Sequence, residues 1–194
     1  MGADIKILLI DENEARAAIL LEGLSSSGLD RIEWLRDTRD LVERIFALDP
    51  DVILIDLENP NRDVLEQMFQ VSRAVKRPIA MFVDQSDSQS IAQAVDAGVS
   101  AYIVNGLKSE RVQSIVDMTV SRFNAFSRLH KELAEAKNAL EERKTVDKAK
   151  GILMKQRALD EAEAYALLRK TAMNKGLKIS EIASSIVTAS ELLG

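Results

Sequence analysis

The stretch Glu141–Gln156, EERKTVDKAKGILMKQ, decides how this chain is organised. It contains no proline and a single glycine, so its composition favours one continuous helix. Ile152–Met154 can pack on one face, while basic residues supply positive charge on another: Arg143, Lys144, Lys148, Lys150, Lys155 and, just beyond, Arg157. Gly151 costs such a helix about 1 kcal/mol relative to alanine. We therefore expect another backbone to approach closely at Gly151.

Two further helices are predicted after this stretch. Asp160 and Glu163 have the spacing of a capping box, and Gly176 is typical of the residue that ends a helix. Ser180 then opens a second helix. The apolar positions of the first helix are Ala164, Leu167, Leu168 and Ala172, and those of the second are Ile182, Ala183, Ile186, Val187 and Leu193.

The region from about residue 143 to 193 resembles the ANTAR domain, a three-helix module of bacterial antiterminators that binds RNA hairpins. The motifs that carry the resemblance are AKGILM at 149–154 and EAY at 163–165. RNA loops expose unstacked bases, which proteins read by hydrogen bonds, shape and stacking. We predict RNA contacts from Arg143, Lys148, Ala149, Lys150, Gly151, Lys155, Tyr165, Arg169 and Lys170.

These residues are expected to contribute in three ways. The basic side chains would neutralise phosphates, and the small residues Ala149 and Gly151 would let the ribose-phosphate chain approach. Tyr165 is the only aromatic residue of this module. It is either a base-stacking residue or a residue at the edge of the helical core, and the sequence leaves both interpretations open.

The composition excludes several classes of function. The chain has 194 residues and no cysteine, so a disulfide framework and a cysteine-based metal site cannot be built. Its single histidine, His130, lies in a charged helical stretch, which disfavours a Ser-His-Asp or zinc-type site. The net charge is −5, but residues 141–194 carry ten Lys/Arg against eight Asp/Glu, which favours nucleic acid at that end. With no membrane-length apolar run and no signal-peptide pattern, we expect a cytoplasmic protein. Because the sequence predicts no arrangement of a nucleophile with a base, we also expect no enzymatic activity.

The N-terminal part of the chain alternates between short apolar runs and helical patterns. Strands are expected at 6–10, 32–35, 52–55, 78–83 and 102–104, and helices at 13–26, 41–48, 63–75 and 88–97. This alternation predicts an α/β fold, with a five-stranded parallel sheet of flavodoxin-like type and helices on both faces.

Three acidic residues are expected to converge at the carboxyl ends of these strands. Asp11 and Glu12 follow the first strand and Asp56 follows the third, and these strands are neighbours in a receiver-type order. Three carboxylates in one pocket repel each other, and a divalent cation is the usual remedy. The region from residue 5 to about 118 resembles the response-regulator receiver domain. That resemblance implies metal binding by Asp11 and Glu12, and phosphorylation at Asp56.

Two positions depart from the receiver pattern. Val83 stands where a hydroxyl residue is expected, and Asn105 stands where a lysine is expected. In receivers these two groups hold the phosphoryl oxygens, and neither valine nor a neutral amide can replace them. We therefore expect an acidic pocket without robust phosphorylation. No cofactor is expected to be required, and we expect only weak Mg²⁺ binding at the acidic pocket.

A long helical stretch joins the two regions, with few breakers between residues 108 and 156. Within it Phe126, Leu129, Leu133, Ala136 and Leu140 alternate spacings of three and four, as in a heptad seam. The seam either forms a coiled coil in a homodimer or packs on the chain's own receiver, and two heptads leave both open. The predicted domains are a receiver-like domain at 1–118, a helical linker at 119–141 and an all-α, three-helix ANTAR domain at 142–194.

The resemblance extends over nearly the full chain to the NasT family, the antiterminators of nitrate and nitrite assimilation genes. The passages that carry it are DLENPNRDV at 56–64, GVSAYIV at 98–104 and SELLG at 190–194. It implies that the protein binds hairpins in leader RNA and allows read-through of a terminator. It also implies restraint by a partner, a NasS-like nitrate/nitrite sensor protein.

A phosphorylation-dependent, DNA-binding response regulator is the alternative. Residues 160–187 can be interpreted as a helix-turn-helix whose second helix enters the major groove. Such a helix needs Arg, Lys, Asn or Gln at the base edges. Residues 181–193 contain none of these, so the sequence disfavours DNA.

Overall fold

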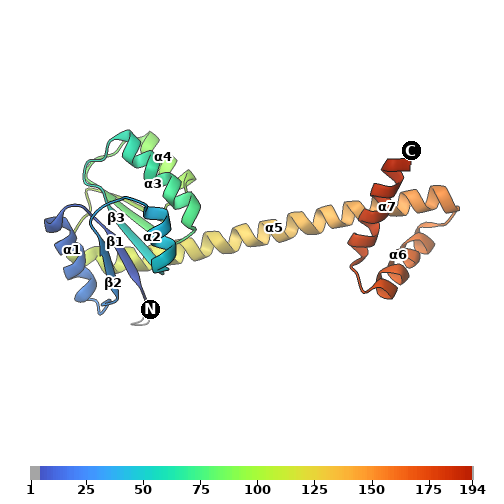
Figure 1. Ribbon diagram of the computed structural model, residues 1–194, viewed down its shortest axis with the longest axis horizontal. Coiled ribbons are helices and arrows are strands. Elements are labelled where there is room, and N and C mark those ends of the chain that lie inside the picture. Colours follow the sequence, from blue (N-terminus) through green and yellow to red (C-terminus); the bar gives the residue numbers. More distant parts are fainter. Residues whose placement is uncertain (1–4, 194) are drawn as a thin grey trace. The chain divides into compact units, whose positions relative to one another are not determined.

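The computed structural model describes residues 5–193, apart from the side chain of Leu193. The chain divides into two compact units, Met1–Ser127 and Arg128–Gly194. The long helix α5 (Val112–Arg157) runs through this division and contributes residues to both units (Figure 1).

One parallel sheet forms the centre of the N-terminal unit. Its strands are β1 (Ile7–Ile10), β2 (Ile32–Leu35), β3 (Val52–Asp56), β4 (Ile79–Val83) and β5 (Ala101–Val104). They lie in the order β2-β1-β3-β4-β5, the order of flavodoxin-like folds. The predicted fold class, a receiver-like sheet followed by a long helix and further helices, is confirmed.

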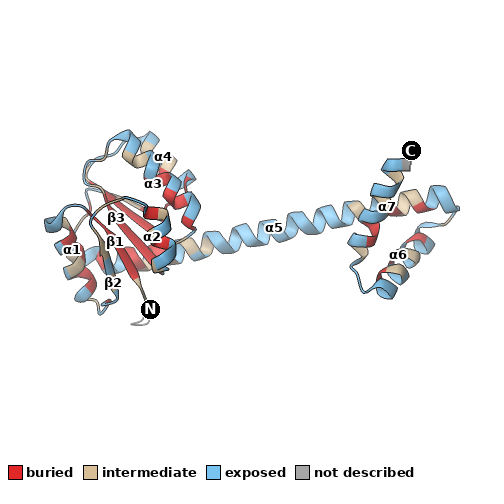
Figure 2. Ribbon diagram, viewed as in Figure 1, coloured by how far each residue is buried: buried red, intermediate tan, exposed pale blue. Residues whose placement is uncertain are grey.

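The strands are continuous apolar runs because helices cover both faces of the sheet (Figures 1 and 2). Ile7 and Leu9 pack on one side with α1 (Glu14–Ser25) and the first turns of α5. Leu8 and Ile10 pack on the other side with α2 (Leu41–Leu48), α3 (Arg62–Val75) and α4 (Ser88–Asp96). The two-residue period of a strand therefore divides each run between two cores.

Local signals set where the helices begin. The side chains of Asn13, Asn61 and Asp87 accept backbone N–H bonds and cap α1, α3 and α4. The helix α5 begins at Val112, after a 3₁₀ turn at Ser109–Arg111, and therefore later than residue 108. This turn packs on Gly23, where an added Cβ would lie 2.5 Å from the carbonyl oxygen of Ser109.

The C-terminal unit contains the end of α5 with α6 (Glu161–Lys175) and α7 (Ile179–Leu193). The predicted capping box is present: Glu163 N–H donates to Asp160 at 2.7 Å, and Asp160 N–H donates to Glu163 at 2.9 Å. Gly176 ends α6 with φ of 64°, a left-handed conformation that suits glycine. Except for Leu193, whose side chain is outside the described part, the predicted apolar positions of both helices contribute to one core.

The predicted seam on α5 is exposed. Phe126, Leu129, Leu133 and Leu140 have exposed fractions of 52, 56, 53 and 53%. These side chains are therefore core residues of neither unit, and much of this part of α5 is coloured as exposed in Figure 2. The domain boundaries predicted at residues 118 and 141 fall inside a continuous helix and stay a prediction. Among residues 5–193, no helix combines the length and the apolar character that a membrane span needs.

Candidate functional site

A groove of about 860 Å³ lies among the end of α5, α6 and the start of α7. Four of the residues predicted to contact RNA line it: Arg143, Lys150, Tyr165 and Arg169. Arg143, Asp147 and Lys150 are spaced by three or four residues, and Tyr165 and Arg169 by four, so each set shares one helix face. The tertiary structure thus brings two arginines and one aromatic ring to a single surface hollow.

The accessibility of these side chains suits a ligand larger than an ion. Arg143 and Arg169 are exposed, and Tyr165, which lines the same groove, is 44% exposed. Tyr165 follows the fully buried Ala164, so it stands at the edge of the helical core with part of its surface accessible. The structure is consistent with both interpretations of Tyr165, because a residue at the core edge can still offer its ring to a ligand.

Lys178 lines the same groove, although the sequence argument did not select it. It lies in the turn between α6 and α7, and its Nζ is 3.9 Å from the carboxylate of Glu142. A basic residue two positions after the helix-ending Gly176 was the available signal, because a tight turn there returns the chain toward α5.

Lys150 is engaged within the protein. Its ammonium group lies 2.7 Å from Asp147 Oδ1 and 2.7 Å from Glu161 Oε1, and its side chain is only 16% exposed. The hydrogen bond with Asp147, followed by the bond with Glu161, raises the pKa of Lys150. Lys150 therefore joins α5 to α6 and has less free charge for phosphate than the sequence indicated.

The prediction that Ala149 contacts RNA is wrong for this structure. Ala149 has an exposed fraction of 0% and packs in the core with Ala164, Leu168 and Ala183. A small side chain at this position lets helices approach each other, so its role is in packing.

Gly151 has a different environment from the one we expected. Beyond its own helix backbone, no heavy atom of the described residues lies within 4 Å of the position that a Cβ would occupy. Close packing against the described part of the chain therefore does not account for this glycine, contrary to the expectation of a nearby backbone within the protein. The side of the helix at Gly151 is open to a partner.

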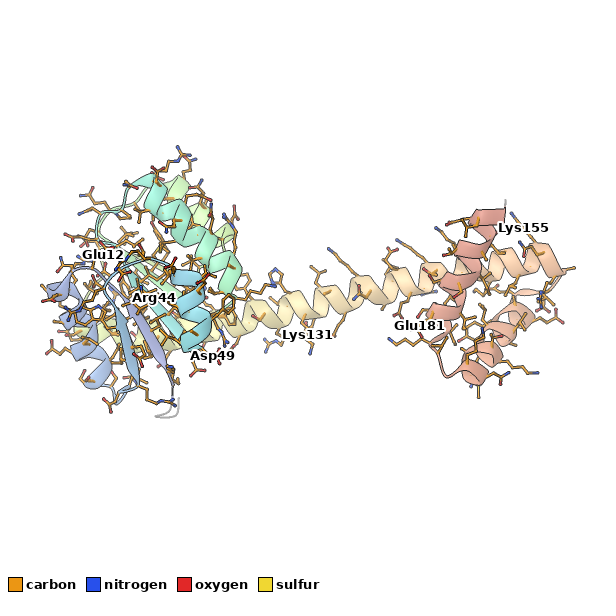
Figure 3. All side chains as sticks on the ribbon, in the orientation of Figure 1. Glu12, Arg44, Asp49, Lys131, Lys155 and Glu181 are labelled. Atoms are coloured by element: carbon orange, nitrogen blue, oxygen red, sulfur yellow. The ribbon has the colours of Figure 1, made fainter. Side chains whose placement is uncertain are left out.

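The remaining predicted contacts lie outside the groove lining. Lys148, Lys155 and Lys170 are exposed, and Lys155 is near the C-terminal end of α5 (Figure 3). The nine predicted residues therefore divide into four that line the groove, one core residue, the open glycine Gly151 and three exposed lysines.

The acidic pocket of the N-terminal unit is built from neighbouring strands. Ile10 pairs with Ile55, so Asp11 and Asp56 lie together at the carboxyl ends of β1 and β3. Both are buried, with exposed fractions of 2% and 4%. Glu12, labelled in Figure 3, is exposed instead. Two of the three predicted carboxylates therefore share the buried pocket.

Arg16 supplies the positive charge of this pocket, and sequence reasoning missed it. Its guanidinium donates to both oxygens of Asp56, from Nε to Oδ2 at 2.8 Å and from Nη2 to Oδ1 at 2.9 Å. Its Nη1 donates to Asp84 Oδ1 at 2.8 Å. The position of Arg16 on α1, one turn after the N-cap Asn13, was the only signal in the sequence.

The residues of the pocket do not fit a divalent cation in this arrangement. Both oxygens of Asp56 are bonded to Arg16, and Asp11 Oδ1 accepts the N–H of Asn13 at 2.8 Å. Within residues 5–193, no group of three His, Cys, Asp or Glu side chains is arranged to hold a metal ion. Arg16 therefore engages both oxygens of Asp56, a residue at which we expected weak Mg²⁺ binding.

The burial of Asp11 is only partly compensated by hydrogen bonds. Burial raises the pKa of Asp11 to about 6; the N–H of Asn13 opposes the rise and the charge of Asp56 adds to it. Its Oδ2 is buried without a hydrogen-bond partner. The indole N–H of Trp34 donates to the backbone oxygen of Asp11 at 3.0 Å, which places this ring beside the pocket.

The two positions that depart from the receiver pattern lack phosphoryl-binding groups in the structure as well. Val83 is 1% exposed and belongs to the core on one face of the sheet. Asn105 follows β5 with φ of 48° and is exposed. Neither side chain brings a hydroxyl or an ammonium group to Asp56.

Comparison with known proteins assigns both regions. Residues 7–117 match the response regulator receiver domain, and residues 134–187 match the ANTAR domain. Because the receiver match spans more than half of the chain, this protein belongs to the response regulator receiver family, with an ANTAR domain after the receiver. The predicted combination of a receiver and an ANTAR domain is confirmed.

Two relatives illustrate the range of similarity. The transcriptional regulatory protein PdtaR of Mycobacterium tuberculosis is 27% identical over 181 residues, covering 93% of this chain and 88% of the relative. The nitrate regulatory protein of Klebsiella oxytoca is 35% identical over 80 residues, covering 41% of this chain and only 20% of that protein. Both relatives are regulators by name.

Solved structures show the same receiver fold. A two-component response regulator from Clostridium difficile superposes with a TM-score of 0.53 at 22% identity, covering 62% of this chain and 99% of that one. A response regulator from Thermotoga maritima gives 0.51 at 16% identity, covering 60% and 98%. At these identities the likeness establishes the fold of the receiver part alone.

Proposed function

We propose that this protein is an RNA-binding transcription antiterminator that binds hairpins in leader RNA through its ANTAR domain. The groove among α5, α6 and α7 carries this proposal, because Arg143, Arg169 and Tyr165 meet there. Arginine pairs with phosphate in a planar fork and stacks on bases. A half-exposed tyrosine offers a further stacking face, worth about 1–3 kcal/mol per base in single-stranded complexes.

The size of the groove agrees with a flipped-out nucleotide of a hairpin loop. Its volume of about 860 Å³ lies in the range of ligand-binding clefts. A regular duplex does not enter such a hollow, whereas unpaired loop bases do. The alternative, DNA recognition by α7, lacks support because residues 181–193 contain no Arg, Lys, Asn or Gln.

A titration of the full chain tests this proposal. Labelled two-hairpin leader RNA, and duplex DNA of matched length, would be titrated at several salt concentrations. We expect tighter binding to the RNA, with an affinity that falls as salt rises. Preference for the duplex DNA would overturn the proposal and favour the DNA-binding alternative.

Matched arginine variants locate the interface. Arg143→Ala should weaken RNA binding by about tenfold, equivalent to about 1.4 kcal/mol. Arg128→Ala is the control, since Arg128 is also exposed on α5 but lies about 22 Å earlier along the helix at 1.5 Å per residue. Equal effects of the two substitutions would show general charge attraction and contradict a site in the groove.

We propose nitrate and nitrite assimilation genes as the targets, and a NasS-like nitrate/nitrite sensor as the partner that restrains this protein. The support is the resemblance to the NasT family and the local similarity to a nitrate regulatory protein. Such a protein acts in the cytoplasm, where leader transcripts are made. In a purified transcription system, we expect the sensor to suppress read-through and nitrate to restore it. Read-through that the sensor leaves unchanged would contradict this part of the proposal while leaving RNA binding intact.

A further inference from the structure

The receiver pocket is balanced by a side chain of the protein itself. Asp11 and Asp56 are buried at 2% and 4% exposure, and the partly exposed Asp84 lies beside them. A buried carboxylate needs a compensating positive charge. In the described structure Arg16, whose side chain is 16% exposed, provides that charge by contacts to two of the three carboxylates.

The geometry of Arg16 leaves little room for a competing cation. Its guanidinium bonds both oxygens of Asp56 at 2.8 and 2.9 Å, and Asp84 at 2.8 Å. Asp56 Oδ1 also accepts the backbone N–H of Glu58 at 3.1 Å. Mg²⁺ requires nearly octahedral oxygen ligands at about 2.0–2.1 Å. Asp56 Oδ1 already accepts two hydrogen bonds and Oδ2 accepts one, and the adjacent guanidinium charge repels a cation at the remaining acceptor site.

We propose that Arg16 replaces the divalent cation in this receiver, and that the pocket becomes a Mg²⁺ site only when the guanidinium is removed. The net charge of this pocket therefore does not change with the Mg²⁺ concentration. The fully buried Asp56, with both oxygens engaged, is also shielded as a nucleophile. The buried Asp11 Oδ2, which has no hydrogen-bond partner, is the ligand that an entering cation would satisfy.

The protein contains its own reporter for this test. Trp34 is the single tryptophan of the chain, and its indole N–H bonds the backbone oxygen of Asp11 at 3.0 Å. A cation that binds Asp11 and Asp56 changes the electric field at this indole. Tryptophan fluorescence of the full chain therefore measures occupancy of the pocket without any assay of activity.

The decisive experiment is a titration of the parent, Arg16→Met and Arg73→Met with MgCl₂, with KCl added to hold ionic strength constant. Methionine keeps the apolar stem of arginine and removes its charge. Arg73, ion-paired with Glu66 on the surface of α3, is the control for simple loss of an arginine. We expect a saturable fluorescence change for Arg16→Met alone. A saturable change in the parent, or no change in Arg16→Met, would overturn the proposal.

Thermal unfolding provides a second readout if Arg16→Met is unstable. Near saturation, Mg²⁺ should raise the Tm of this variant by about 10 °C and leave the parent unchanged. The double variant Arg16→Met/Asp56→Asn replaces the unpaired carboxylate by a neutral amide of the same shape. We expect it to recover most of the Tm lost in Arg16→Met and to ignore Mg²⁺. Failure of Asp56→Asn to restore Tm would mean that Arg16 contributes packing rather than charge, and would reject the proposal.

Discussion

Lys150 on α5 and Glu161 on α6 form an ion pair of 2.7 Å that joins two helices of the ANTAR domain. Asp147 contacts the same ammonium group at 2.7 Å, so two carboxylates share one lysine. A lysine held in this way gives up these partners before it can neutralise a phosphate. The consequence is that basic residues in one short stretch of α5 differ in their expected contribution to RNA binding.

The first prediction compares Lys155 with Lys150. Each phosphate neutralised adds roughly 0.7–0.9 to the slope of log affinity against log salt. Lys155→Ala should flatten this slope by nearly one unit, because Lys155 is exposed near the end of α5. Lys150→Ala should change the slope less and lower the Tm of the ANTAR domain. RNA titrations at four salt concentrations and thermal unfolding of both variants check this, and a larger slope change for Lys150→Ala would contradict it.

The second prediction concerns Gly151, around which the described chain leaves open space. Gly151→Ala should stabilise the helix by about 1 kcal/mol, because alanine has the higher helix propensity and meets no neighbour. Gly151→Val should keep the fold and weaken RNA binding without changing the salt slope, because its branched side chain blocks approach to the helix. Chemical denaturation and RNA titration separate the two effects. Normal RNA binding by Gly151→Val would remove this side of α5 from the interface.

The third prediction concerns the exposed seam of α5. We propose that Leu133, 53% exposed, lies at the centre of a homodimeric coiled coil. Leu133→Glu should then convert a dimer to a monomer in sedimentation experiments, because it places a charge in the apolar seam. Asn138→Glu is the control, since position 138 lies opposite the seam in the heptad. Parent and Leu133→Glu chains of equal mass would show that the seam serves another purpose.

The fourth prediction concerns phosphorylation. Asp56→Ala should leave read-through in cells unchanged, because Arg16 engages Asp56 and Val83 and Asn105 supply no group that holds a phosphoryl oxygen. A reporter placed after a leader terminator measures this, with protein levels checked by immunoblot. Arg143→Ala is the positive control that should lose read-through. Loss of read-through by Asp56→Ala at normal protein levels would show that this carboxylate carries a signal.

The fifth prediction concerns pH. Because the pKa of Asp11 is raised from 3.8 to about 6, the folded state holds this proton more tightly than the unfolded state. The resulting stabilisation is fully present below pH 3.8 and is lost as the pH rises through 6. The stability of Asp11→Asn relative to the parent should therefore increase by roughly 1–3 kcal/mol as the pH rises from 4 to 7.5. Chemical denaturation across this range measures the gain, with the exposed Asp96→Asn as the comparison. A difference independent of pH would contradict the raised pKa.

Much of the fold could be predicted because its signals are local. The apolar runs at residues 6–10 and 52–55 match β1 and β3 closely, since strands buried on both faces have few polar positions. The ends of α6 could be predicted equally well, because the residues that set them act on the backbone within one turn. These residues are Asp160 and Glu163 in the capping box and the left-handed Gly176. Such signals depend on neighbours in the sequence, so a single sequence contains them.

The tertiary structure alone decided which charges meet. Arg16 and Asp56 are 40 residues apart, and α1 and β3 had to fold together before their pairing existed. The connection between α5 and α6 likewise brings Lys150 and Glu161 together. Helix packing also decided that Ala149 is buried. Helical periodicity predicts which residues share a face, but whether that face meets water, another helix or an opposite charge depends on the packing of distant elements. The sequence therefore determined the elements and their order, and packing determined which basic residues are available to bind a ligand.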